Sequence, residues 1–237
     1  MNQQPKLDSL EQYQKDMARK RRYATLARAY LKRAEAAGIP ERFVAIRKER
    51  LASLLSPEYH GDVVSFVNKI FANPLDLFKK PYIIIDGGDV ESRKEAGYAL
   101  LFRMISCDRV GFVDECSAIV HQFQTSLKVG FNHSAYADEL KETDILSISE
   151  CSARLFSAHL DTGGFLDEVL SYRYDRLKPT ILSFSEGLTK KDNNLMSTTA
   201  SRPGAYWGNY LTAISLLQYS SLRIRVRVNK DGRDNRE

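Results

Sequence analysis

The sequence has no apolar run long enough to cross a membrane, and it contains few cysteines. A helix that spans a bilayer needs about 20 predominantly apolar residues, whereas apolar stretches such as residues 98–102 are far shorter. The three cysteines form no Cys-x-x-Cys pair, which argues against a zinc site and against a disulfide framework. The polar N-terminus also lacks the apolar stretch of a secretory signal. These absences predict a cytoplasmic protein with reduced thiols and no membrane partner.

The usual signatures of metal and hydrolase sites are also missing. The four histidines are scattered along the chain, without the short spacing that metal ligands normally show. No serine lies in a Gly-x-Ser-x-Gly sequence, which a hydrolase elbow requires. The sequence therefore predicts no metal site and assigns no nucleophile.

The composition is that of a globular protein with one main domain. The chain has 237 residues, of which 43% are hydrophobic and 27% charged, enough for one good core. Its net charge of +5 is unevenly distributed, since residues 1–60 hold 13 Lys/Arg against 7 Asp/Glu while the rest hold 22 against 23. A local basic region attracts nucleic acid or an acidic protein surface, or it is simply the solvated face of a helix.

The basic region coincides with a predicted amphipathic helix over residues 10–36. Ser9 and Gln12 resemble a capping box, and Gly38 and Pro40 end the helical pattern. The apolar stripe packs either on the chain's own core or in a groove of another protein. The candidate partner-binding residues are Leu10, Tyr13, Met17, Tyr23 and Tyr30. The candidate DNA-binding residues are Arg19, Lys20, Arg21 and Arg22.

From residue 82 onward, short apolar runs alternate with longer amphipathic segments, a pattern typical of a parallel sheet covered on both faces. The predicted strands are residues 82–86, 109–114, 144–149, 180–185 and 222–228. The predicted crossover helices are residues 92–105, 115–127 and 164–176. In the last strand, arginines at 223, 225 and 227 alternate with apolar residues. They predict a half-exposed strand whose arginines solubilise an edge or contact phosphates. The predicted organisation is an N-terminal helical segment (1–40), an α/β core (41–228) and a disordered tail (229–237).

The first predicted strand leads through Gly87 and Gly88 into a helix, which is where a P-loop would lie. A working P-loop has the sequence Gly-x-x-x-x-Gly-Lys-Ser/Thr, because backbone N–H groups wrap the phosphates, the lysine neutralises them and the hydroxyl holds magnesium. With Gly87 as the first glycine, Ser92 takes the second glycine, Arg93 the lysine and Lys94 the hydroxyl position. The stretch is either a degenerate P-loop or a tight turn of an unrelated α/β protein.

The third predicted strand ends in Ser149-Glu150, at about the position of a Walker B motif. An active ATPase ends that strand in two acids, one for the magnesium shell and one that polarises the attacking water. Here Ser149 replaces the first acid. Glu150 is the remaining acid, and we interpret it as vestigial because no magnesium site is predicted beside it. The vestigial nucleotide-binding residues predicted so far are Gly87, Gly88, Ser92, Arg93, Lys94 and Ser149.

Three further segments resemble segments of one protein family and occur in the same order as in that family. They are residues 37–43, residues 64–74 and residues 165–183 with Tyr172-Arg173-Tyr174. With them the chain, over residues 37–228, resembles the AAA+ replicative-helicase loaders of the DnaC and DnaI type and the related IstB transposition helpers. The resemblance implies a five-stranded parallel AAA+-type sheet, like that of P-loop NTPases, with flanking helices. It also places Ser185 where the family carries a sensor asparagine, so Ser185 joins the vestigial nucleotide-binding residues.

The resemblance implies that the chain binds a replicative DnaB-type helicase through its N-terminal segment. Single-stranded DNA and further copies of the chain are the other partners that it implies. Because the magnesium and sensor positions are lost, we expect no cofactor, no catalytic residue and no ATP hydrolysis. The predicted function is a loader-like adaptor in DNA replication, encoded by a phage or another mobile element.

Two alternatives remain at this point. In the first, the chain is an active helicase loader or an IstB-like transposition helper with an unusual site for ATP and magnesium. Arg93 or Lys94 would then hold the phosphates and Glu150 would act as the base. In the second, the chain inhibits helicase loading by occupying the place of the loader on the helicase.

Overall fold

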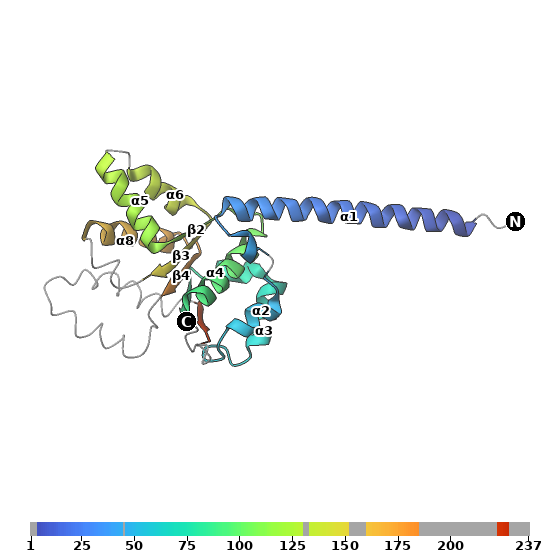
Figure 1. Ribbon diagram of the computed structural model, residues 1–237, viewed down its shortest axis with the longest axis horizontal. Helices are drawn as coiled ribbons and strands as arrows, with labels where there is room; N and C mark the ends of the chain where they lie inside the picture. The colour runs from blue at the N-terminus through green and yellow to red at the C-terminus, as the bar shows by residue number, and fades with distance from the viewer. Residues whose placement is uncertain (1–3, 45, 130–132, 152–159, 185–221, 228–237) are drawn as a thin grey trace, which may run out of the picture.

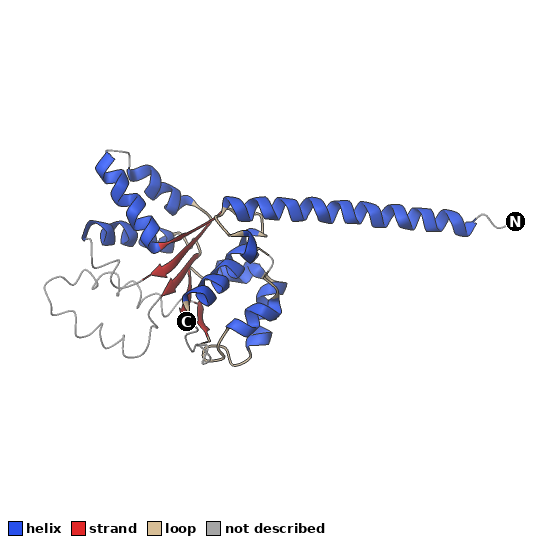
Figure 2. Cartoon of the chain, viewed as in Figure 1, coloured by secondary structure: helices blue, strands red, loops and turns tan. Residues whose placement is uncertain are grey.

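The computed structural model describes residues 4–44, 46–129, 133–151, 160–184 and 222–227. A central sheet lies between two layers of helices, and one long helix, α1 (Gln4–Ala36), extends away from them (Figures 1 and 2). The predicted Ser185 and the predicted tail at 229–237 lie outside the described residues. None of the described helices is both long and apolar enough to span a membrane.

The sheet has five strands in the order β2-β3-β4-β1-β5, and all its neighbours are parallel. The strands are β1 (Tyr82–Gly87), β2 (Gly111–Glu115), β3 (Ile145–Cys151), β4 (Thr180–Phe184) and β5 (Leu222–Val226). The structure confirms the predicted α/β class and the parallel five-stranded sheet. The apolar runs located these strands because parallel strands are buried on both faces.

Each face of the sheet carries its own hydrophobic cluster. The first face is covered by α2 (Lys48–Leu54), α3 (Val63–Ala72), α4 (Val90–Ile105) and the short 3-10 helices η1 (Glu41–Phe43) and η2 (Pro74–Lys79). The second face is covered by α5 (Cys116–Val129), α6 (His133–Glu142) and α8 (Leu160–Asp175). Strand β1 serves both clusters, since Ile83 and Ile85 enter the first while Tyr82 and Ile84 enter the second.

Helix α1 is longer than predicted, because it begins at Gln4 and not at residue 10. Pro5 does not interrupt it, since the first turn of a helix has no intrahelical acceptor for the missing N–H. The predicted end is correct. Gly38 adopts a φ of +80°, and Ile39 N–H donates to the carbonyl of Ala34 at 2.9 Å, which closes the last turn in the manner of a glycine C-cap.

Within the described part of the chain, the buried contacts of α1 lie at its C-terminal end and in the residues that follow it. Ala34, Ala37 and Ile39 belong to the buried cluster on the first face of the sheet. Further toward the N-terminus the helix is exposed, and Tyr13 and Tyr23 have 63% and 57% of their surface accessible. Of the two predicted alternatives, packing on the chain's own core therefore applies to the C-terminal end of α1.

Both edges of the sheet are covered by segments from the N-terminal part of the chain. At the β2 edge, Val113 N–H donates to the carbonyl of Ala37 at 2.9 Å. At the β5 edge, Ser56 N–H donates to Arg225 O at 2.6 Å and Arg227 N–H to Leu54 O at 2.8 Å. Backbone groups at an edge are otherwise open to pairing with another chain.

The prediction of a half-exposed last strand is confirmed, since Ile224 and Val226 are buried while Arg223 and Arg225 are half-buried. Arg223 forms an ion pair with the buried Asp86 at 3.1 Å, and Arg225 pairs with Glu58 at 2.6 Å. The third arginine, Arg227, donates through Nε to the carbonyl of Leu55 at 2.6 Å. These contacts hold β5 and the covering segment together, so the arginines that alternate with the apolar residues have partners within the chain as well as partial exposure.

Candidate functional site

The candidate nucleotide site lies where β1 passes into α4. The strand ends at Gly87, and the helix begins at Val90, so Gly88 and Asp89 are the only residues between them. In the P-loop alignment, Ser92 and Arg93 stand in the phosphate-binding loop, yet both residues lie within the helix. The turn is therefore shorter than a loop that wraps phosphates.

The N-terminus of α4 is occupied by the chain's own carboxylate. Asp89 is the N-cap, and its side chain accepts hydrogen bonds from Ser92 N–H and from Ser92 Oγ, both at 2.8 Å. The bond from the backbone of Ser92 lowers the pKa of Asp89, so its carboxylate is charged at neutral pH. A helix N-terminus is a natural anion site, and here Asp89 already supplies the anion.

Arg93 fills the space between the turn and the end of β3. Its side chain is 3% exposed and donates twice to Glu150, from Nε at 3.1 Å and from Nη2 at 2.9 Å. Its Nη1 donates to the carbonyls of Gly87 and Gly88 at 3.0 and 2.9 Å. The cation that aligns with the P-loop lysine is thus bound by protein acceptors.

An irregularity at the end of β3 directs Glu150 toward Arg93. The pairing of β3 with β4 shifts between Ile148 and Cys151, and Glu150 has a φ of +55°. Ser149 lines the space under α4, while Ile148 and Cys151 enter the cluster on the opposite face. Regular alternation would send Glu150 to that opposite face, and the bulge removes it from there.

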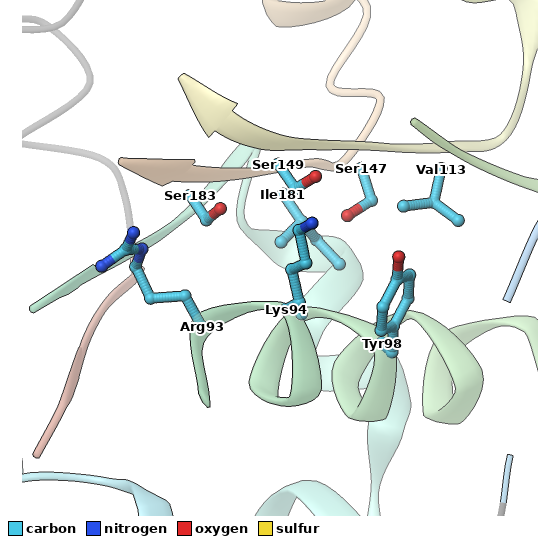
Figure 3. A pocket seen from close by; sticks show the side chains of 9 residues that line it. Arg93, Lys94, Tyr98, Val113, Ser147, Ser149, Ile181 and Ser183 are labelled. Atoms are coloured by element: carbon cyan, nitrogen blue, oxygen red, sulfur yellow. The ribbon is translucent and has the colours of Figure 1, made fainter. Parts of the chain in front are cut away.

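The space between α4 and the sheet is small. Its volume is about 10 Å³, which is at the lower limit for one water molecule. Figure 3 shows Lys94 and Tyr98 extending from α4 toward Ser147 and Ser149 on the sheet. Lys94 Nζ lies 2.5 Å from Oε1 of Glu115, and this hydrogen bond raises the pKa of Lys94.

Magnesium and ATP do not fit this arrangement. The hydroxyl position of the P-loop is occupied by Lys94, a cation that repels a metal ion. The remaining acid of the Walker B position, Glu150, already binds Arg93 in a bidentate pair. Among the described residues, no group of three or more His, Cys, Asp or Glu is placed to hold a metal ion.

Sequence reasoning identified most of this site but missed some of its members. The predicted Gly87, Gly88, Ser92, Arg93 and Lys94 lie together at the turn and on the first turns of α4. Ser149 and Glu150 join them from the end of β3. It missed Asp89, although its spacing of three residues from Ser92 is a capping signal, and it missed Glu115, for which no local signal exists.

A buried arginine in the segment that resembles helicase loaders was also missed. Arg173 is fully buried; it donates to Thr180 Oγ1 at 2.9 Å and to the carbonyls of Leu140, Thr143 and Pro179 at 2.9, 2.7 and 2.8 Å. Burial lowers the pKa of Arg173 to about 10, so it remains charged at neutral pH. The arginine joins α6, α8 and the start of β4, and its role is structural.

The predicted partner-binding and DNA-binding residues all lie on α1, away from the nucleotide site (Figure 1). Arg19, Lys20, Arg21 and Arg22 are exposed. Four consecutive helical residues point in different directions, since each step turns the helix by about 100°. Arg19 folds back on Tyr23, whose hydroxyl it contacts at 3.3 Å. The backbone of Leu10 is helical, while its side chain lies outside the described part of the chain.

The sequence by itself matches no protein-family model and no curated protein. The fold, in contrast, is similar to solved structures. The crystal structure of the DnaC helicase loader matches with a TM-score of 0.55 and 11% identity, over 79% of this chain and all of that one. A crystal structure of DnaI matches with a TM-score of 0.54 and 13% identity, over 79% of this chain and 94% of that one.

A replication initiator, DnaA bound to AMPPCP and single-stranded DNA, matches with a TM-score of 0.51 and 12% identity. That match covers 76% of this chain and 50% of the initiator. At such low identities the similarity concerns the fold. The chain therefore has the fold of the AAA+ helicase loaders and replication initiators, which confirms the structural part of the resemblance seen in its sequence.

Proposed function

We propose that the chain is a loader-like adaptor in DNA replication that binds a hexameric DnaB-type helicase without hydrolysing ATP. Its place of action would be the cytoplasm, and its source a phage or another mobile element. The observation that carries the proposal is the combination of a loader fold that matches the whole of the DnaC chain with a nucleotide position closed by Arg93 and Glu150.

The proposed absence of hydrolysis is supported by the contacts of the charged residues. A base that activates water must be free to accept a proton, and Glu150 already accepts two hydrogen bonds from Arg93. Lys94, the alternative phosphate ligand, is held by Glu115. The active-ATPase alternative would need both pairs to separate before nucleotide could bind.

The proposed helicase contact is supported by the geometry of α1. Residues 12–28 of this helix are exposed almost throughout, and an isolated helical segment gains little stability from its own hydrogen bonds. Tyr13 and Tyr23 present large, rigid rings on it, a type of residue that often anchors interfaces. We infer that α1 is the arm that reaches the helicase, with Leu10, Met17 and Tyr30 as further contacts.

The basic residues of α1 support an additional contact with single-stranded DNA. Arg19, Lys20, Arg21 and Arg22 form no ion pair within the described part of the chain. Unpaired cations are free to neutralise phosphates, and each such contact makes binding weaker at higher salt concentration. We place DNA on these residues and the helicase on the apolar and aromatic ones.

Co-purification and titration with a replicative helicase test this proposal. The double variant Tyr13→Ala/Tyr23→Ala should weaken helicase binding by about tenfold or more, since truncation of an aromatic anchor commonly costs 2 kcal/mol or more. A matched control removes exposed apolar side chains from the domain instead, as Val110→Ala/Leu177→Ala. Unchanged binding by the α1 variant, or equal loss in both variants, would refute the role of α1.

A reconstituted helicase-loading assay separates an adaptor from an inhibitor, because both need the same contact with the helicase. An adaptor increases the amount of helicase on single-stranded DNA, whereas an inhibitor lowers it in the presence of the resident loader. Phosphate release in the presence of magnesium–ATP, abolished by Glu150→Gln, would instead establish the active-ATPase alternative, which includes a transposition helper.

A further inference from the structure

The contacts of Arg93 join three separate parts of the sheet at one edge. Its guanidinium binds the carbonyls of the turn after β1 and the carboxylate at the end of β3. Glu150 is in turn tied to β4, because its backbone N–H donates to Ser183 Oγ at 3.1 Å. This is the carboxyl edge of a parallel sheet, the edge at which α/β proteins bind their ligands.

Neighbouring residues pack closely on the turn that carries this network. Strand β5 presses on the turn, since a Cβ placed on Gly88 would lie 2.4 Å from Cγ1 of Val226. The N-terminus of α4 is capped by Asp89. Figure 3 shows Arg93 extending past Ser183, on the side where the strand arrows end. Protein groups therefore already bind the cation, the carboxylate and the helix N-terminus at this turn.

The backbone of Glu150 indicates that its contact with Arg93 is specified and not incidental. A φ of +55° is rare for a residue with a Cβ, and such conformations persist only where the surrounding structure enforces them. Here the bulge in β3 and the bond to Ser183 hold the backbone in place. This conformation places the carboxylate of Glu150 against the guanidinium of Arg93, whose side chain is only 3% exposed.

We propose that the Arg93–Glu150 pair is an internal substitute for bound nucleotide. In a nucleotide-dependent relative of this fold, phosphates and magnesium connect the turn after the first strand with the end of the third. In this chain the guanidinium makes that connection permanently, so the carboxyl edge of the sheet keeps one arrangement with or without nucleotide. The inference rests on the proposed function, which needs a binding surface that is ready without ATP.

The chemistry of arginine explains why this residue stands at the lysine position. A guanidinium presents a planar fork of N–H donors, which serves a carboxylate through two bonds and further acceptors through the remaining ones. A lysine ammonium has three donors at a single point, and it cannot span Glu150 and the two glycine carbonyls together. The variant Arg93→Lys should therefore fail to replace arginine.

Hydrogen exchange of the full-length protein, followed by mass spectrometry, tests the proposal without a helicase. In the unaltered chain, exchange at residues 86–93 and 148–151 should be the same with and without magnesium–ATP. In Arg93→Met, exchange in both segments should rise by about tenfold or more, since hydrogen bonds to charged groups are worth at least that factor in an opening equilibrium. The neighbouring variant Lys94→Met is the matched control and should leave both segments within about twofold.

Three outcomes would overturn the proposal. They are protection of the unaltered chain by magnesium–ATP, unchanged exchange in Arg93→Met, and equal effects of Arg93→Met and Lys94→Met. If Arg93→Met does not fold, Glu150→Gln supplies the same comparison, because the amide keeps the shape of the side chain and one acceptor while the charge is lost. A missing helicase contact would leave these results unaffected, so the two proposals fail independently.

Discussion

Basic side chains are exposed on helix α1 but buried at the carboxyl edge of the sheet. On α1, basic side chains such as Arg21 and Arg22 are exposed and form no ion pair within the described part of the chain. At the sheet edge, Arg93 is buried and donates hydrogen bonds to the carboxylate of Glu150 and to two backbone carbonyls of the protein itself. One region thus leaves its charged side chains exposed, while the other uses its buried cation in internal contacts.

The distribution of charge supports this contrast. Helix α1 holds nine Lys/Arg and four Asp/Glu, so its surplus equals the net charge of +5 of the whole chain. The remainder of the chain is neutral in sum, and its cations pair with acids or carbonyls in many cases. The basicity that the sequence shows is thus a property of the projecting helix, where it is available for binding.

Removal of the most deeply buried arginine should give the largest effect on stability. Arg173→Met leaves several carbonyls and Thr180 without a donor, and each buried acceptor left without a hydrogen bond costs about 1–3 kcal/mol. Urea unfolding followed by circular dichroism measures the change. The control Arg176→Met removes an exposed arginine three residues away, whose guanidinium lies 4.0 Å from the centre of the Tyr172 ring. A loss below about 1 kcal/mol in Arg173→Met would contradict the structural role.

An alanine at Gly88 should have the next largest effect, because it tests how tightly the turn is closed. The added Cβ would meet Val226 at 2.4 Å, and the residue has a φ of +58°. We expect a loss of about 1–3 kcal/mol in the free energy of unfolding. At Gly61 an added Cβ meets nothing within 4 Å, so Gly61→Ala should be neutral or slightly stabilising. Equal melting temperatures of the two variants would show that the turn is open.

The smallest effect on stability is expected on α1. Tyr13→Ala/Tyr23→Ala should change the free energy of unfolding by less than about 0.5 kcal/mol, because exposed residues away from packed contacts contribute little. The same pair of substitutions should weaken helicase binding. Denaturant unfolding of this variant beside the unaltered chain is the measurement, and a large loss of stability would mean that α1 folds back onto the domain.

The sequence predicted the sheet well because each strand carries its own signal. Runs such as Tyr82–Ile85 are apolar on both faces, and a central parallel strand requires that pattern. Helix α6 was missed because His133–Glu142 is polar over much of its length. The start of α1 was placed too late, since the cap signal at Ser9 was given more weight than the helix-forming residues before it.

The sequence placed several residues of the candidate site in one region, but it did not give their contacts. Motif order placed Arg93 and Glu150 in the same region, although they are 57 residues apart. The sequence did not show that they bind each other, because a pairing across that distance depends on the bulge at the end of β3. For Arg223 and Arg225 the alternation correctly indicated a half-exposed strand. It did not reveal their partners, because Asp86 and Glu58 are remote in sequence.

The covered edges of the sheet have a consequence for synthesis on the ribosome. The free side of β1 is filled by β5, whose residues leave the ribosome about 140 residues after those of β1. At a synthesis rate of about 5–20 residues per second, one side of β1 stays unpaired for many seconds before β5 is made. Residues 54–56, which later cover β5, are made before β1. A nascent chain stalled before Leu222 would expose an apolar strand edge, and we expect such chains to depend on chaperones.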